Sequence, residues 1–170
     1  MSSSVGTIFS GLGVGLTSAV GDVLVVKQNQ PLPEWSKSTK TKDQELAELR
    51  SAIDFVSGTL DELGAKAGGT TAEIFDALKM LLEDDELFEV ASANIEDGWS
   101  AAAAIGKAVD EFSELLSGDP TFDERVGDFQ DLSKRVQARI AGIEMSLSIP
   151  ATGQIVLVGE DFSPADTAQF

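Results

Sequence analysis

The sequence predicts a mainly α-helical protein, in which an antiparallel four-helix bundle is inserted in an incomplete α/β unit. Three observations support this fold class. Apolar residues recur every three or four positions through four long segments in the middle of the chain. Short runs rich in valine lie before and after that block, at residues 23–26 and 155–158. Glycine and proline separate the periodic segments, so we expect short turns between the helices.

Residues 1–30 are predicted to supply the first strands of the α/β unit. Residues 6–10 and 19–26 have strand-like composition, and a glycine-rich turn joins them. The GxGxG spacing in this turn does not indicate a phosphate loop, because the Gly-Lys-Ser/Thr ending of a P-loop is missing. Residues 31–42 contain two prolines and a polar run, and are predicted to be a linker.

Residues 43–145 are predicted to form the helical domain. The first helix carries one apolar stripe at steps of three and four, formed by Leu46, Leu49, Ile53, Val56, Leu60 and Leu63. The breaks after the first three helices are Gly68-Gly69, Asp97-Gly98 and Gly118-Asp119-Pro120. The four expected helices span residues 43–67, 71–96, 99–117 and 122–142.

Residues 146–170 revert to a strand pattern and complete the chain. The apolar run at 155–158 is expected to pair with the early strand in one small sheet. Ser163-Pro164-Ala165-Asp166 is typical of a helix start, with Ser at the cap and Pro at the first helical position. Only four residues follow, and so short a helix is marginal in water. The sequence therefore predicts a chain cut within its α/β unit.

Composition excludes several function classes. The 170 residues contain no Cys, His or Tyr, which removes disulfides, thiolate metal sites, a cysteine nucleophile and the commonest general base. The net charge is −17, and residues 43–144 hold 24 acidic against eight basic residues. Such a surface repels nucleic acid and anionic lipid and attracts a basic protein. A solvated surface or adaptation to high salt explains the same charge.

The apolar stretch at residues 5–26 does not indicate export or membrane insertion. No basic residue precedes it, and it contains five glycines and Asp22. We expect a cytoplasmic protein with no membrane partner.

The densest acidic cluster follows an apolar run. Met80, Leu81 and Leu82 overfill one stripe, so one or two of them are expected to face outward. The next four residues, Glu83-Asp84-Asp85-Glu86, point around most of a helix and cannot converge on one metal ion. An exposed Met-Leu pair beside acids is a plausible docking patch, whereas burial of all three apolar residues is the alternative.

Three segments resemble enzyme I of the phosphoenolpyruvate:sugar phosphotransferase system. Ile74-Phe75 followed by residues 80–87 (MLLEDDEL) resembles the family's IF…MLLEDEEL segment. Residues 128–135 (DFQDLSKR) resemble its DxRDxxxR segment, and residues 155–168 resemble its strand followed by SPADTA. The three segments occur in family order and cover most of the chain.

This resemblance implies a four-helix domain that binds the phosphocarrier HPr, inserted in a swivelling α/β phosphohistidine domain. In the family the active-site histidine lies in a GGxTSH motif shortly after SPADTA, and this chain contains neither. The resemblance therefore implies the HPr-recognition part of a phosphotransferase, with no catalytic residue of its own. Magnesium belongs to the family's C-terminal domain, so no cofactor is expected here. Without the family's dimerisation domain, we expect a monomer.

The resemblance also implies the partner-binding residues. Family docking positions correspond to Met80, Leu81, Asp85, Glu86, Leu115, Leu116 and Arg125. Three departures from the family pattern imply weaker or differently centred binding. Gly69-Thr70 replace an acidic pair, Gln130 replaces an Arg, and Leu12 stands where a Pro is common.

Two other functions are compatible with the sequence. One is a free-standing acidic helical adaptor with no link to phosphotransfer. The other is a non-catalytic regulator that retains the docking face without the histidine. An in-frame GGxTSH downstream of Phe170 would favour a cut enzyme I, whereas an immediate stop codon would favour the regulator.

Overall fold

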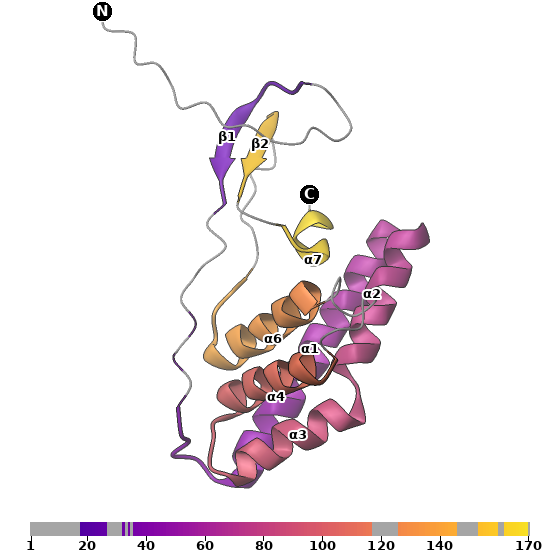
Figure 1. Cartoon of the computed structure of the whole chain (residues 1–170). Helices are drawn as coiled ribbons and strands as arrows, with labels where there is room; N and C mark the ends of the chain where they lie inside the picture. The colour runs from indigo at the N-terminus through magenta and orange to yellow at the C-terminus, as the bar shows by residue number, and fades with distance from the viewer. Residues whose placement is uncertain are drawn as a thin grey trace, which may run out of the picture.

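A computed structural model describes residues 18–26, 32, 34, 36–116, 126–145, 153–159 and 162–169. Figure 1 shows a helical bundle with a two-stranded sheet beyond one end of it, and the short helix α7 between the two. The fold class predicted from the sequence is confirmed. None of the helices in the described ranges is long and apolar enough to cross a membrane.

Helix α1 (Lys42–Ala67) is the longest element of the bundle. Thr41 begins it with a capping box, in which Thr41 Oγ1 accepts from the Gln44 amide and the Gln44 side chain accepts from the Thr41 amide. Its buried stripe includes the predicted residues from Leu49 to Leu63. Gly68, at φ +67°, ends the helix in a conformation that favours glycine.

The single helix expected over residues 71–96 is wrong, because the structure has two helices there. Helix α2 (Gly69–Leu82) begins at Gly69 rather than Thr71, and helix α3 (Asp85–Glu96) follows after a break of two residues. Asp84 is extended, at φ −63° and ψ 127°, and its carboxylate accepts from the Glu86 amide at 2.8 Å. This local cap competes with continuation of the helix.

Helices α4 (Ala101–Leu116) and α6 (Val126–Ala141) complete the bundle. They match the expected third and fourth helices, although residues 117–125 lie outside the described part. Helix α1 packs on α2 and α6, while α4 packs on α3 and α6. The largest fully buried side chains are Phe75, Phe129, Leu49, Leu60, Leu82, Leu87, Ile105 and Leu132.

The predicted pairing of the flanking strands is confirmed. Strand β1 (Asp22–Val25) lies parallel to β2 (Ile155–Val158), with Asp22 opposite Ile155. A parallel pair requires a crossover connection, and the whole bundle serves as that connection. The expected strand at residues 6–10 and the glycine-rich turn lie outside the described residues.

Helix α7 (Pro164–Thr167) has the predicted helix start. Ser163 Oγ accepts from the Asp166 amide at 3.2 Å, and the Asp166 carboxylate accepts from the Ser163 amide at 3.2 Å. Ala165 is buried in the same apolar core as the bundle helices. Helix α7 is therefore the described element that packs the α/β part on the bundle.

Candidate partner-binding surface

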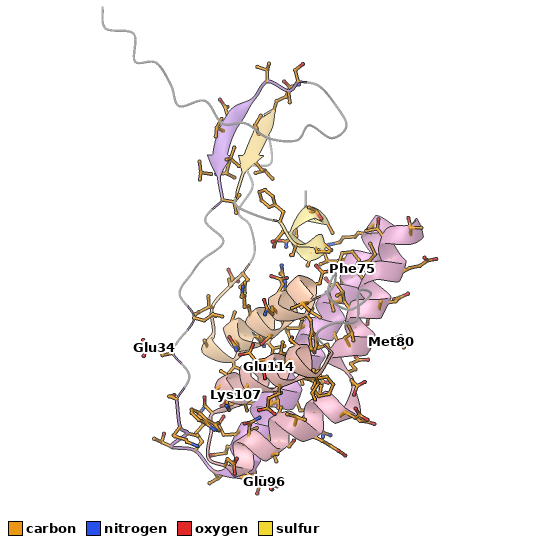
Figure 2. All side chains as sticks on the ribbon, viewed as in Figure 1. Glu34, Phe75, Met80, Glu96, Lys107 and Glu114 are labelled. Atoms are coloured by element: carbon orange, nitrogen blue, oxygen red, sulfur yellow. The ribbon has the colours of Figure 1, made fainter. Side chains whose placement is uncertain are left out.

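The apolar run at the end of α2 divides between core and solvent. Met80 is 74% exposed, Leu82 is 1% exposed, and Leu81 lies between them, partly buried against the core. The expectation that one or two of the three face outward is confirmed. Figure 2 shows the Met80 side chain projecting from α2. An exposed methionine is adaptable in shape, which suits it to contact with another protein.

The acidic cluster is divided among three roles. Glu83 ends α2 and lies 4.0 Å from Lys79, which also pairs with Asp61 at 2.7 Å. Asp84 caps α3, as described above. Asp85 and Glu86 lie in the exposed first turn of α3, where the partial positive charge of the helix N-terminus favours carboxylates. These two residues form an acidic edge at the junction of α2 and α3. Met80 lies a few residues earlier in the sequence.

The other predicted docking residues lie at or beyond the end of α4. Leu115 is 80% exposed. Leu115 and Met80 are the two most exposed large apolar side chains of the described helices. Leu116 ends α4, and its side chain lies outside the described part, as does Arg125. The structure therefore shows two exposed apolar residues and two exposed acids of the predicted set, while the assignment of a partner to them stays a prediction.

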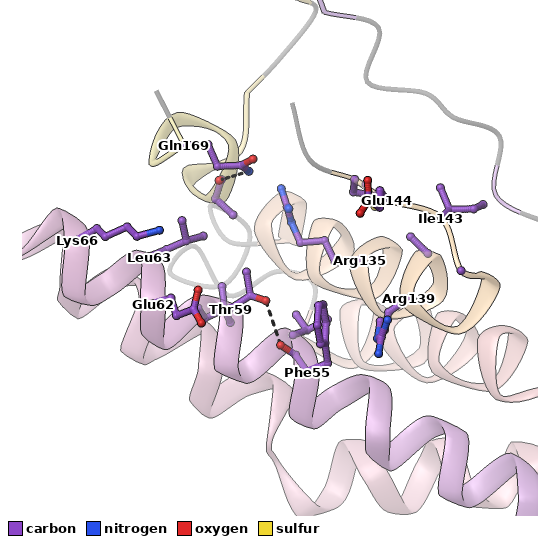
Figure 3. Close-up of a pocket in the computed structure, with 16 residues that line it drawn as sticks. Phe55, Thr59, Glu62, Leu63, Lys66, Arg135, Arg139, Ile143, Glu144 and Gln169 are labelled. Atoms are coloured by element: carbon purple, nitrogen blue, oxygen red, sulfur yellow. Dashed lines mark hydrogen bonds between the residues drawn. The ribbon is translucent and has the colours of Figure 1, made fainter. Parts of the chain in front are cut away.

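A pocket of about 520 Å³ lies between α1, α6 and α7, and the sequence did not predict it. Figure 3 shows it bounded by Phe55 and Thr59 of α1, Arg139 of α6, and Gln169 just after α7. The Arg139 guanidinium lies 4.1 Å from the centre of the Phe55 ring, a cation–π contact. Phe55 does not belong to the apolar stripe of its helix. This position in the sequence is the feature from which an exposed aromatic residue could have been predicted.

Arg135 lines the same pocket and joins α6 to α7. Its Nε donates to Asp131 at 2.7 Å, and its Nη2 donates to Asp166 at 2.7 Å and to Ser163 Oγ at 3.0 Å. Burial by itself would lower the pKa of Arg135, but the two acids outweigh burial and raise it. Burial likewise would raise the pKa of Asp166, but Arg135 outweighs it and lowers that pKa.

The two surfaces differ in chemical character from a metal or histidine site. In the described ranges, no three His, Cys, Asp or Glu side chains are grouped so that they could hold a metal ion. The chain contains no histidine or cysteine at any position. What the geometry offers is an apolar contact rimmed by acids, together with a second concave surface at the α6–α7 junction.

Comparison with solved structures defines the class of this fold. An NMR solution structure of an Enzyme I (nEIt) protein matches with a TM-score of 0.70 and 25% identity, over 88% of this chain and 63% of that one. A structure described as the N-terminal domain of Enzyme 1 - Nitrogen matches with a TM-score of 0.65 and 21% identity, over the same shares. A helical bundle inserted between parallel strands is thus the Enzyme I N-terminal fold.

The chain belongs to the family described as PEP-utilising enzyme, N-terminal, which matches residues 10–125. Its curated relatives include phosphoenolpyruvate-protein phosphotransferases of Streptomyces coelicolor, 29% identical over 95% of this chain, and of Staphylococcus aureus, 31% identical over 82%. The chain covers 30% and 26% of the length of these two relatives. The resemblance to enzyme I inferred from the three sequence segments is confirmed.

Proposed function

We propose that this chain recognises the phosphocarrier HPr, as part of a phosphotransferase that passes a phosphoryl group from phosphoenolpyruvate through a histidine to HPr for sugar uptake. The observation that carries the proposal is the junction of α2 and α3. There the exposed Met80, near the end of α2, is followed in the sequence by the exposed Asp85 and Glu86 in the first turn of α3. An apolar anchor with a charged rim is the usual anatomy of a transient protein interface. The resemblance to enzyme I, whose helical domain binds HPr, supports the choice of HPr as the partner.

The proposal does not assign the phosphoryl-carrying step to these 170 residues. They contain no histidine and therefore cannot form a phosphohistidine. We expect incubation with phosphoenolpyruvate and magnesium to leave this chain unmodified. A stoichiometric acid-labile phosphate on it, detected by mass spectrometry at neutral pH, would contradict this part of the proposal.

Titration with HPr of the same organism tests the docking face. Met80→Ala should raise the dissociation rate and weaken binding by about 1–2 kcal/mol, because a central anchor acts mainly on the lifetime of the complex. Ile74→Ala is the matched control, since Ile74 is also an exposed apolar residue of α2. If Met80→Ala lowers the melting temperature while affinity stays that of the parent chain, Met80 is a stabilising residue rather than an anchor.

Charge reversal tests the acidic edge separately. Asp85→Lys with Glu86→Lys should slow association and reduce its dependence on salt, since rim charges act mainly on the encounter rate. Asp54→Lys with Glu62→Lys makes the same change in net charge on exposed positions of α1. Equal effects of the two pairs would mean that only the overall charge matters, and would place the docking face elsewhere.

A further inference from the structure

The contact between α6 and α7 brings together two parts of the chain that are far apart in the sequence. Arg135 belongs to the bundle, whereas Ser163 and Asp166 begin α7, 28 and 31 residues later. In Figure 1 α7 lies between the two-stranded sheet and the helices. The side chains of this contact thus join the α/β part to the bundle.

Arg135 makes two hydrogen bonds across this contact and one to its own helix, all in a mostly buried position. Its side chain is 12% exposed, that of Asp166 is 11% exposed, and that of Asp131 is 22% exposed. Asp131 sits one turn before Arg135 on α6 and holds the guanidinium through Nε, which leaves Nη2 directed at α7. The arginine is therefore preorganised by its own helix before it meets α7.

The residues that Arg135 reaches are the ones that make α7 a helix. Ser163 and Asp166 form the capping box of α7, and Arg135 Nη2 contacts the side chains of both. A four-residue helix has almost no stability of its own. Its apolar contacts with the bundle include the buried Ala165 and the partly buried Ala168, two small side chains that contribute little apolar area.

We infer that Arg135 is a positioning residue, which orders α7 and fixes the α/β part in one orientation on the bundle. Asp131 orients the guanidinium, which then donates hydrogen bonds to the two side chains of the α7 capping box. Without Arg135, the two carboxylates lose their shared cation in a mostly buried place, and α7 loses its main polar attachment. The sheet and the bundle would then hold no fixed orientation, while each keeps its own internal contacts.

Double electron–electron resonance measures this orientation directly. The chain has no cysteine, so Ser51→Cys in α1 with Val23→Cys in β1 places spin labels at two exposed positions only. With Arg135 present we expect one narrow distance distribution. Arg135→Leu should broaden it, and should reduce the protection of the α7 amides against hydrogen exchange by about tenfold or more, with bundle amides unchanged. Asp166→Asn, which removes the charge but keeps the size of the side chain, should act in the same direction more weakly.

Lys134→Leu is the matched control, because Lys134 is the exposed neighbour of Arg135 on α6 and its loss changes the charge equally. It should leave both the distance distribution and α7 protection unchanged. An unchanged distribution in Arg135→Leu and Asp166→Asn would overturn the inference. So would a parallel loss of protection in α7 and the bundle, since that is the result of a general stabilising role. Neither readout uses HPr, so the outcome does not depend on the proposed function.

Discussion

Glu45 offers a sharp test of how the bundle is held together. It is an acidic residue of α1, yet it is only 3% exposed. Its Oε2 accepts from the amide of Ala101, the first residue of α4, at 2.6 Å, and its Oε1 accepts from Ser38 Oγ. A carboxylate of one helix therefore serves as the N-terminal cap of another, 56 residues away. The start of an α-helix carries a partial positive charge, which suits an acidic side chain as its cap.

The magnitude follows from these contacts. Glu45→Ala removes a cap, which costs about 1 kcal/mol, and leaves the buried Ala101 amide without that acceptor, which costs about 1–3 kcal/mol. Since the two terms overlap, we expect a loss of about 2–3 kcal/mol in the free energy of unfolding. For a chain of this size that lowers the melting temperature by about 4–10 °C. Glu45→Gln keeps one acceptor oxygen for the Ala101 amide, but it loses the charge and places an NH2 group where the second oxygen faces Ser38 Oγ, so about 1 kcal/mol is expected.

Urea denaturation followed by circular dichroism, with a thermal melt of each variant, measures these differences. Glu48→Ala is the control: its ion pair with Lys40 is exposed, so its loss should change stability by less than about 1 kcal/mol. The reasoning is refuted if Glu45→Ala stays within about 0.5 kcal/mol of the parent chain, or if it costs no more than Glu48→Ala.

Three further predictions test other parts of the structure. Leu87→Ala, at a side chain that is 0% exposed, should lower the free energy of unfolding by about 3 kcal/mol, measured by urea denaturation. Because the pKa of Asp166 is lowered from 3.8, its stabilising effect is present above that pH and is lost as pH falls through the lower folded-state value. The protection of the α7 amides against hydrogen exchange should therefore fall at acid pH, and Asp166→Asn should abolish this dependence on pH. Gly21→Ala would place a Cβ against the Gln154 backbone carbonyl, so nuclear magnetic resonance should show the loss of β1–β2 pairing with the bundle intact.

The elements that follow from local pattern were predictable from the sequence. The stripe from Leu49 to Leu63 gave the buried face of α1, and the valine-rich runs gave the two paired strands. The cap at Ser163 was readable because its two partners are three residues apart. One helical stripe cannot hold three successive apolar residues, so it was predictable that one or two of Met80, Leu81 and Leu82 face outward, but not which of them.

The break between α2 and α3 was missed for a local reason. Leucine periodicity continues from Leu78 through Leu82 to Leu87, and all three side chains are buried in the same core. A pattern of burial alone therefore indicates one helix. The competing signal is the side chain of Asp84, whose carboxylate accepts from the Glu86 amide where the chain is extended. Periodicity of the leucines does not report this cap.

The tertiary structure alone decided where the charged and aromatic exceptions lie. By sequence, Glu45 and Arg135 are polar positions of amphipathic helices and belong on the solvent side. Glu45 is buried and Arg135 is mostly buried, because Ala101 and Asp166, 56 and 31 residues away, form hydrogen bonds with them that offset the cost of desolvation. Phe55 is 52% exposed because it lines the open pocket between α1, α6 and α7, where Arg139 lies over its ring. Periodicity reports which face of a helix is apolar, whereas the partners of each polar side chain are fixed only when distant segments meet.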